Sequence, residues 1–151
     1  MMLENKISLE INDDEIKEIT EAVRVLKEKL EPKLVKLTPD ERKELIRLSG
    51  KAIDFVYLAY DFAKDNPTLV PGYLEVPEMK KDMDAVNKLN DILAPLEQLC
   101  TLIDDSISLA GSEAYIAALA FFTAVKGAAK MNIPGAEEIH EKLRDQRFPS
   151  K

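Results

Sequence analysis

The side chains best suited to chemistry form a polar stripe in the middle of the chain. Hydroxyls and carboxylates recur there every three to four residues: Thr101, Asp104, Asp105, Ser108 and Ser112. On a helix this spacing places them on one face. Two interpretations are open. The stripe is an acidic docking face or carboxylate-bounded pocket, or it is the solvated face of an amphipathic helix, which we favour.

Most of the net charge lies around this stripe. The 151 residues hold 21 Lys and Arg against 28 Asp and Glu, which gives −7. Residues 89–125 contain no Lys or Arg and these five acids: Asp91, Glu97, Asp104, Asp105 and Glu113. We add Glu113 to the candidate polar face. An acidic chain is not expected to bind nucleic acid, because phosphates require basic patches.

The sequence offers little for catalysis. Asp104 and Asp105 are adjacent, so on a helix they diverge by about 100° rather than converge on one substrate. The single His, His140, forms one Glu-x-x-His with Glu137, a spacing that di-iron bundles use twice. Cys100, the single Cys, has no nearby base in the sequence and is expected to be a small buried side chain. We therefore predict no catalytic residue, metal or cofactor.

A second candidate site surrounds the connection 66–77. This segment carries three prolines and several apolar side chains, so it is expected to be an ordered loop lying on the helices. Asn90 interrupts an apolar helix seam, where it would line a small pocket or sit at the core margin. The candidate pocket or loop contacts are Asn90, Tyr57, Tyr60, Tyr73 and Tyr115. The tyrosines suit a ligand pocket and a core margin equally well.

Apolar periodicity predicts an all-α fold in a single domain, 1–151. We expect a helical bundle of four main helices plus a short C-terminal helix, after an extended N-terminal arm. The predicted segments are the arm 1–12 and helices at 13–31, 39–65, 77–110, 112–131 and 134–147. Helix 112–131 is apolar on nearly every side, so it is expected to be the central helix or part of an oligomer interface.

No membrane span or targeting segment is expected. The most apolar window, Ala114–Val125, has 12 residues, whereas a transmembrane helix needs about 20. A lone Cys excludes a disulfide framework within the chain. These observations predict a cytoplasmic protein.

Several short motifs carry a resemblance to known proteins. They are Asn66-Pro67, Leu69-Val70-Pro71, Tyr73-Leu74, Leu109-Ala110-Gly111-Ser112-Glu113-Ala114-Tyr115, Ala117-Ala118-Leu119, Val125-Lys126 and Asn132-Ile133-Pro134-Gly135-Ala136. With these motifs the chain resembles a group of small, all-helical bacterial proteins without an assigned function. The resemblance implies a bacterial origin and a helical fold, and it implies no catalytic or cofactor residue.

Three functions remain open, in this order. The first is a non-enzymatic helical module that forms a homodimer or binds a protein partner. The second is a binder of a small apolar ligand with the 66–77 loop as its lid. The third is an enzyme that uses the carboxylates of the polar stripe, alone or with a metal.

Overall fold

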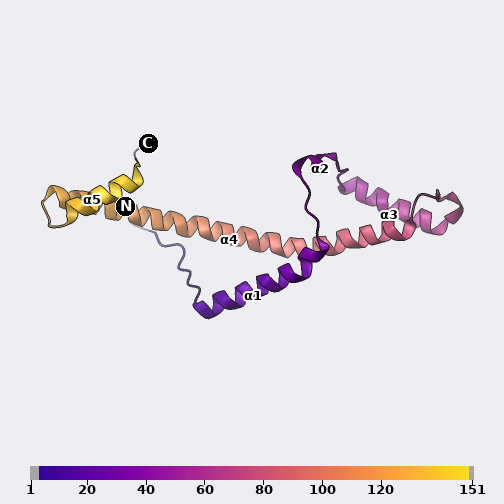
Figure 1. Ribbon diagram of the computed structural model, residues 1–151, viewed down its shortest axis with the longest axis horizontal. Coiled ribbons are helices and arrows are strands. Elements are labelled where there is room, and N and C mark those ends of the chain that lie inside the picture. Colours follow the sequence, from indigo (N-terminus) through magenta and orange to yellow (C-terminus); the bar gives the residue numbers. More distant parts are fainter. Residues whose placement is uncertain (1–3, 150–151) are drawn as a thin grey trace. The chain divides into compact units, whose positions relative to one another are not determined.

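The computed structural model describes residues 4–149. Those residues form helices joined by turns and contain no strand, which confirms the all-α prediction (Figure 1). The chain divides into two compact units. One unit joins the N-terminal arm, up to Glu10, to the chain from Glu97 onward, and the other is Ile11–Leu96. Residues 1–3 of the predicted arm lie outside the described residues.

The second unit begins with α1, Asp13–Leu30. Asn12 caps this helix, and Asn12 and Glu15 form a reciprocal capping box with hydrogen bonds of 2.8 and 2.9 Å. A 3₁₀ turn, Glu31–Lys33, follows because Pro32 cannot continue the α-helical hydrogen bonding. The helix therefore begins and ends within one residue of the predicted 13–31.

The prediction of one helix at 39–65 is wrong. The chain forms α2, Pro39–Glu44, and α3, Gly50–Asp65, with extended backbone at Leu45. The capping box of Thr38 and Glu41 starts α2 as its residue types indicate. Gly50, which we expected inside the helix, instead starts α3 with a φ of +33°, a conformation that glycine adopts without a steric penalty.

The connection after α3 is built from hydrogen-bonded turns. A 3₁₀ turn spans Pro67–Leu69, and the Leu74 N–H donates to the Pro71 carbonyl at 3.0 Å. Leu69 and Tyr73 are 79% and 92% exposed, so these two side chains do not lie against the helices. Figure 1 shows α3 beside the first part of α4, which follows this connection.

A single helix, α4, runs from Val76 to Lys130. The predicted break at Gly111-Ser112, which separated helices 77–110 and 112–131, is therefore wrong. A glycine inside a helix costs about 1 kcal/mol, and the apolar periodicity continues through it at Ala110, Ala114 and Ala117. Pro95 also lies inside α4.

The last helix, α5, spans Ala136–Arg147 and lies beside the end of α4 (Figure 1). It begins two residues later than the predicted 134–147, because Gly135 has a φ of +83° and ends the preceding turn. The rings of Phe122 and His140 lie 5.2 Å apart between the two helices. Val125 and Ala136 are the buried apolar residues among the described part of the chain.

The expected four-helix bundle is not confirmed, since the long helix α4 dominates the residues that the structure describes. Because α4 does not turn back at Gly111, its two halves cannot pack against each other as separate helices of an antiparallel bundle. Of the two alternatives for segment 112–131, burial as a central helix is not observed among the described residues, because Val125 is the one buried residue of the segment.

Candidate interaction surface

The polar stripe lies on α4 in the unit that starts at Glu97. Of its five members, Thr101, Asp104, Asp105, Ser108 and Ser112, all are exposed. The Thr101 hydroxyl donates to the Glu97 carbonyl at 3.0 Å, so it is satisfied within its own helix. Among residues 4–149, no group of three or more His, Cys, Asp or Glu side chains could hold a metal ion.

Glu113 differs from the other polar-face candidates because its carboxylate contacts the N-terminal arm. Its carboxylate accepts a hydrogen bond from the Lys6 backbone N–H at 2.6 Å. When the Asn5 side-chain amide is oriented so that its nitrogen has acceptors, that nitrogen also donates to the Glu113 carboxylate at 3.1 Å. Glu113 is half-buried, whereas Asp104 and Asp105 are exposed. Its role in this unit is to hold the N-terminal arm against α4.

Two of the candidate pocket residues meet between α3 and α4. Tyr57 and Asn90 line a cavity of about 40 Å³, with Val56 and Val86 among the other lining residues. The Asn87 amide donates to the Tyr57 hydroxyl. Sequence reasoning missed Asn87, although it precedes Asn90 by three residues and so shares its helix face. A 40 Å³ cavity accommodates a water molecule and no larger ligand.

Tyr60 lies at a larger hollow beside the proline-containing connection. The hollow is open to solvent, has a volume of about 680 Å³, and is lined by loop residues that include Val70 and Leu74. Lys64 lies over the Tyr60 ring, with its Nζ 5.7 Å from the ring centroid. A hydrogen bond to Asp84 at 2.7 Å raises the pKa of Lys80, which also lines the hollow.

The remaining tyrosines, Tyr73 and Tyr115, line neither of these two cavities. Tyr73 is 92% exposed, and Tyr115 is an exposed residue of α4 in the other unit. The hollow at 66–77 therefore has one tyrosine, Tyr60, among its lining residues.

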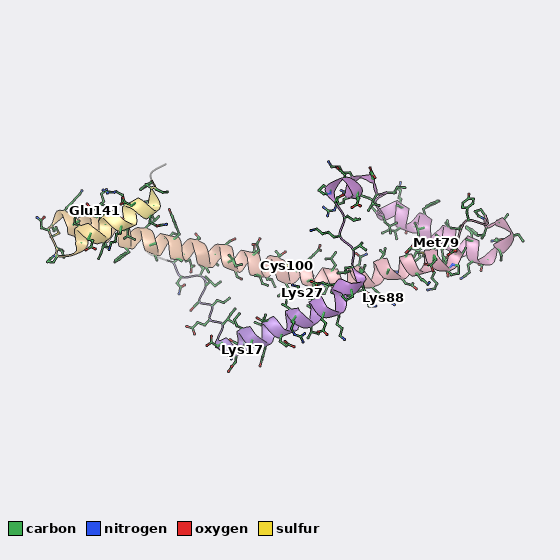
Figure 2. The ribbon with its side chains drawn as sticks, in the orientation of Figure 1. Lys17, Lys27, Met79, Lys88, Cys100 and Glu141 are labelled. Carbon is green, nitrogen blue, oxygen red and sulfur yellow. The ribbon has the colours of Figure 1, made fainter. Side chains whose placement is uncertain are left out.

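A run of exposed apolar side chains lies along α4. Between Leu99 and Ala118 every residue is exposed except Ser106 and Glu113, which are half-buried. Leu102 and Ile107 are each 64% exposed. Cys100, which we expected to be buried, is exposed on this segment (Figure 2). Side chains of this kind are rarely left uncovered in a contiguous patch unless another molecule binds there.

The composition of α4 also meets the criteria for a membrane-spanning helix. An 18-residue window in it has a mean hydropathy of 1.4, and none of that window is buried. Core helices of soluble proteins pass the same test, so the finding is weak on its own.

Comparison with known proteins adds no relative. No protein family, curated protein or solved structure matches this chain.

Proposed function

We propose that this protein is a non-enzymatic helical module whose α4 helix binds another polypeptide chain. The observation that supports the proposal is the exposure of the apolar side chains between Leu99 and Ala118. In water an uncovered helix with this many apolar residues is poorly stabilised, since most helix stability in proteins comes from packing of the apolar face. A bound chain would supply that packing.

The module is proposed to act in the cytoplasm. The acidic residues Asp104 and Asp105 lie on the same segment as the apolar surface, and Glu113 interrupts that surface with a carboxylate. A charged side chain at the centre of a bilayer costs several kcal/mol, which disfavours a membrane-spanning α4. Helical packing against another chain leaves the carboxylates in water.

Thermal unfolding at several protein concentrations tests the proposal. If binding to another chain of the same kind covers α4, the midpoint rises with concentration, by several degrees between about 1 and 100 μM, because association stabilises the folded state. A midpoint independent of concentration, together with a monomer that binds no other polypeptide, would contradict it. Protein that sediments with vesicles of neutral phospholipid would instead indicate a membrane helix.

A second candidate function is supported by the hollow of about 680 Å³ at Tyr60. Its volume falls within the range of small-molecule sites, and Lys64 and Lys80 could pair with an anionic group while the loop contacts an apolar tail. Laurate is a suitable probe in calorimetry. Binding that is weakened about tenfold by Lys64→Ala and unchanged by Lys51→Ala would support this function, and an absence of heat with the wild type would remove it.

A further inference from the structure

The hollow beside the proline-containing connection has an apolar floor. All of its lining residues belong to the unit Ile11–Leu96, and they come from the end of α3, the connection and the start of α4. Four apolar or aromatic lining residues are half-buried, and we call them the floor: Tyr60, Ala63, Val70 and Val76. A ligand that covers this floor must itself carry apolar groups.

Charged side chains also line the hollow, and there are four of them: Lys64, Glu75, Glu78 and Lys80. Two of the four already have partners within α4. Lys80 donates to Asp84 at 2.7 Å, and Glu78 accepts from Lys81. Their charges are therefore compensated in their own helix, which leaves one cation and one anion for a ligand.

The cation and the anion that remain are Lys64 and Glu75. Among residues 4–149, neither side chain takes part in an ion pair. Lys64 lies in the last turn of α3, and its Nζ is 5.7 Å from the centroid of the Tyr60 ring. Glu75 directly precedes α4, and its carbonyl accepts the Met79 N–H at 3.1 Å. The two opposite charges therefore come from the two ends of the connection.

The connection between these charges is already ordered by its own hydrogen bonds. The Val70 N–H donates to the Pro67 carbonyl at 3.2 Å, and the Leu74 N–H donates to the Pro71 carbonyl at 3.0 Å. Proline also restricts φ at two of these positions. A ligand would therefore bind without having to order this loop, and the entropic cost of binding is smaller for a preorganised site.

We propose that the hollow binds a short apolar peptide with free ends, whose carboxylate pairs with Lys64 and whose ammonium group pairs with Glu75. This inference rests on the second candidate function, a small-ligand site at Tyr60, and it names the class of ligand. An extended tripeptide is about 10 Å long and offers three side chains to the floor. The volume of about 680 Å³ lies within the range of sites for molecules of this size.

Two simpler ligands match the hollow less well. A fatty acid supplies a carboxylate for Lys64, but it brings no cation to Glu75. A single apolar amino acid carries both charges on one carbon and has one side chain, so it leaves most of the hollow of about 680 Å³ to water. A short peptide matches both charges and the apolar floor together.

Calorimetry with trileucine and its two blocked forms tests each end of the ligand separately. Acetylation removes the ammonium charge, and amidation removes the carboxylate charge. Wild-type protein is expected to bind trileucine, and to bind each blocked form about fivefold more weakly, because a solvent-exposed ion pair contributes up to about this factor. Free leucine is expected to bind more weakly than any of the three peptides.

Charge-removing variants assign each end of the peptide to its partner. Glu75→Gln should weaken trileucine binding about fivefold and leave the acetylated peptide unchanged, because that peptide has no ammonium group to lose. Lys64→Gln should weaken trileucine binding similarly and leave the amidated peptide unchanged. Lys51→Gln and Asp54→Asn are matched controls on α3 outside the hollow, and both should bind trileucine like the wild type.

The outcomes separate this inference from the function on which it rests. Trileucine binding that is unchanged by blocking its ends, or by Glu75→Gln and Lys64→Gln, would overturn the proposed pairing. Binding of laurate without binding of trileucine would overturn the peptide and leave the second candidate function intact. If neither compound binds, both are overturned. Equal helical circular dichroism in all variants shows that any lost affinity does not come from unfolding.

Discussion

The carboxylate of Glu113 accepts a hydrogen bond from the backbone N–H of Lys6 at 2.6 Å, and so joins residues 107 positions apart. Glu113 is half-buried on α4, among apolar residues such as Leu109 and Ile116. A charged acceptor in this place forms a stronger hydrogen bond than a neutral one. The contact explains how an extended arm without strand partners is held on α4.

Glu113→Ala should release the arm. We expect hydrogen exchange at the Lys6 amide to accelerate about tenfold, since loss of a charge-assisted hydrogen bond of this type costs about 1.4 kcal/mol or more. Glu113→Gln keeps an acceptor oxygen and should show a smaller acceleration. Asp104→Ala, on the polar stripe, is the control and should leave Lys6 exchange unchanged.

Tyr57→Phe should lower the free energy of unfolding by about 1 kcal/mol, because it removes the hydroxyl that accepts from Asn87 at the small cavity between α3 and α4. Denaturant titration at one protein concentration measures this change. Tyr73→Phe is a matched control, since Tyr73 is 92% exposed, and it should alter stability by less than about 0.5 kcal/mol. Equal losses of unfolding free energy in the two variants would contradict a stabilising hydrogen bond between Asn87 and Tyr57.

Gly135→Ala and Gly127→Ala should have opposite effects. Gly135 has a φ of +83°, so a side chain there is strained, and we expect a loss of about 1–2 kcal/mol. Gly127 lies inside α4, where an added Cβ meets nothing within 4 Å. Gly127→Ala should therefore stabilise the protein by up to about 1 kcal/mol. Thermal unfolding of the two variants at equal concentration compares these effects directly.

The start of α2 should weaken in acid. Hydrogen bonds from the backbone N–H and then the hydroxyl of Thr38 lower the pKa of Glu41 below its ordinary value. The stabilisation is therefore fully present above the ordinary pKa of a glutamate and is lost as the pH falls through the lowered pKa. Amide exchange at Thr38, expressed relative to the intrinsic exchange rate of an unprotected amide at the same pH, should increase as the pH falls over that range.

Glu41→Gln provides the comparison for this pH dependence. The glutamine side-chain amide does not titrate, so in this variant the protection of the Thr38 backbone amide should change much less between neutral and acidic pH. Asp40→Asn, in the same turn and outside the capping box, should retain the wild-type dependence. If Glu41→Gln follows the wild-type curve, the capping carboxylate is not the titrating group.

Local signals predicted the helix starts well. The capping residues Asn12 and Thr38 define the beginning of α1 and α2, because a side chain that accepts a backbone N–H fixes the first turn from nearby residues alone. Apolar periodicity was less informative about interruptions. The same steps of three and four residues run through Ser49-Gly50, where the helix begins anew, and through Gly111-Ser112, where it continues.

The sequence predicts the positions of the helices better than it predicts which helices pack against each other. An apolar face shows that a helix needs a neighbour, but it does not show which chain supplies that neighbour. For this reason the burial predicted for Cys100 is not found in the described chain. Among the candidate site residues, Tyr57 and Asn90 do line one cavity, whereas Tyr73 is 92% exposed.

Molar mass by light scattering over a range of concentrations tests most directly the proposal that another polypeptide chain, here taken to be a second copy, covers α4. We predict a species of about 34 kDa, twice the 17.0 kDa of one chain, that dissociates only on dilution. A constant mass of 17.0 kDa at every concentration, with α4 still fully helical, would contradict the claim.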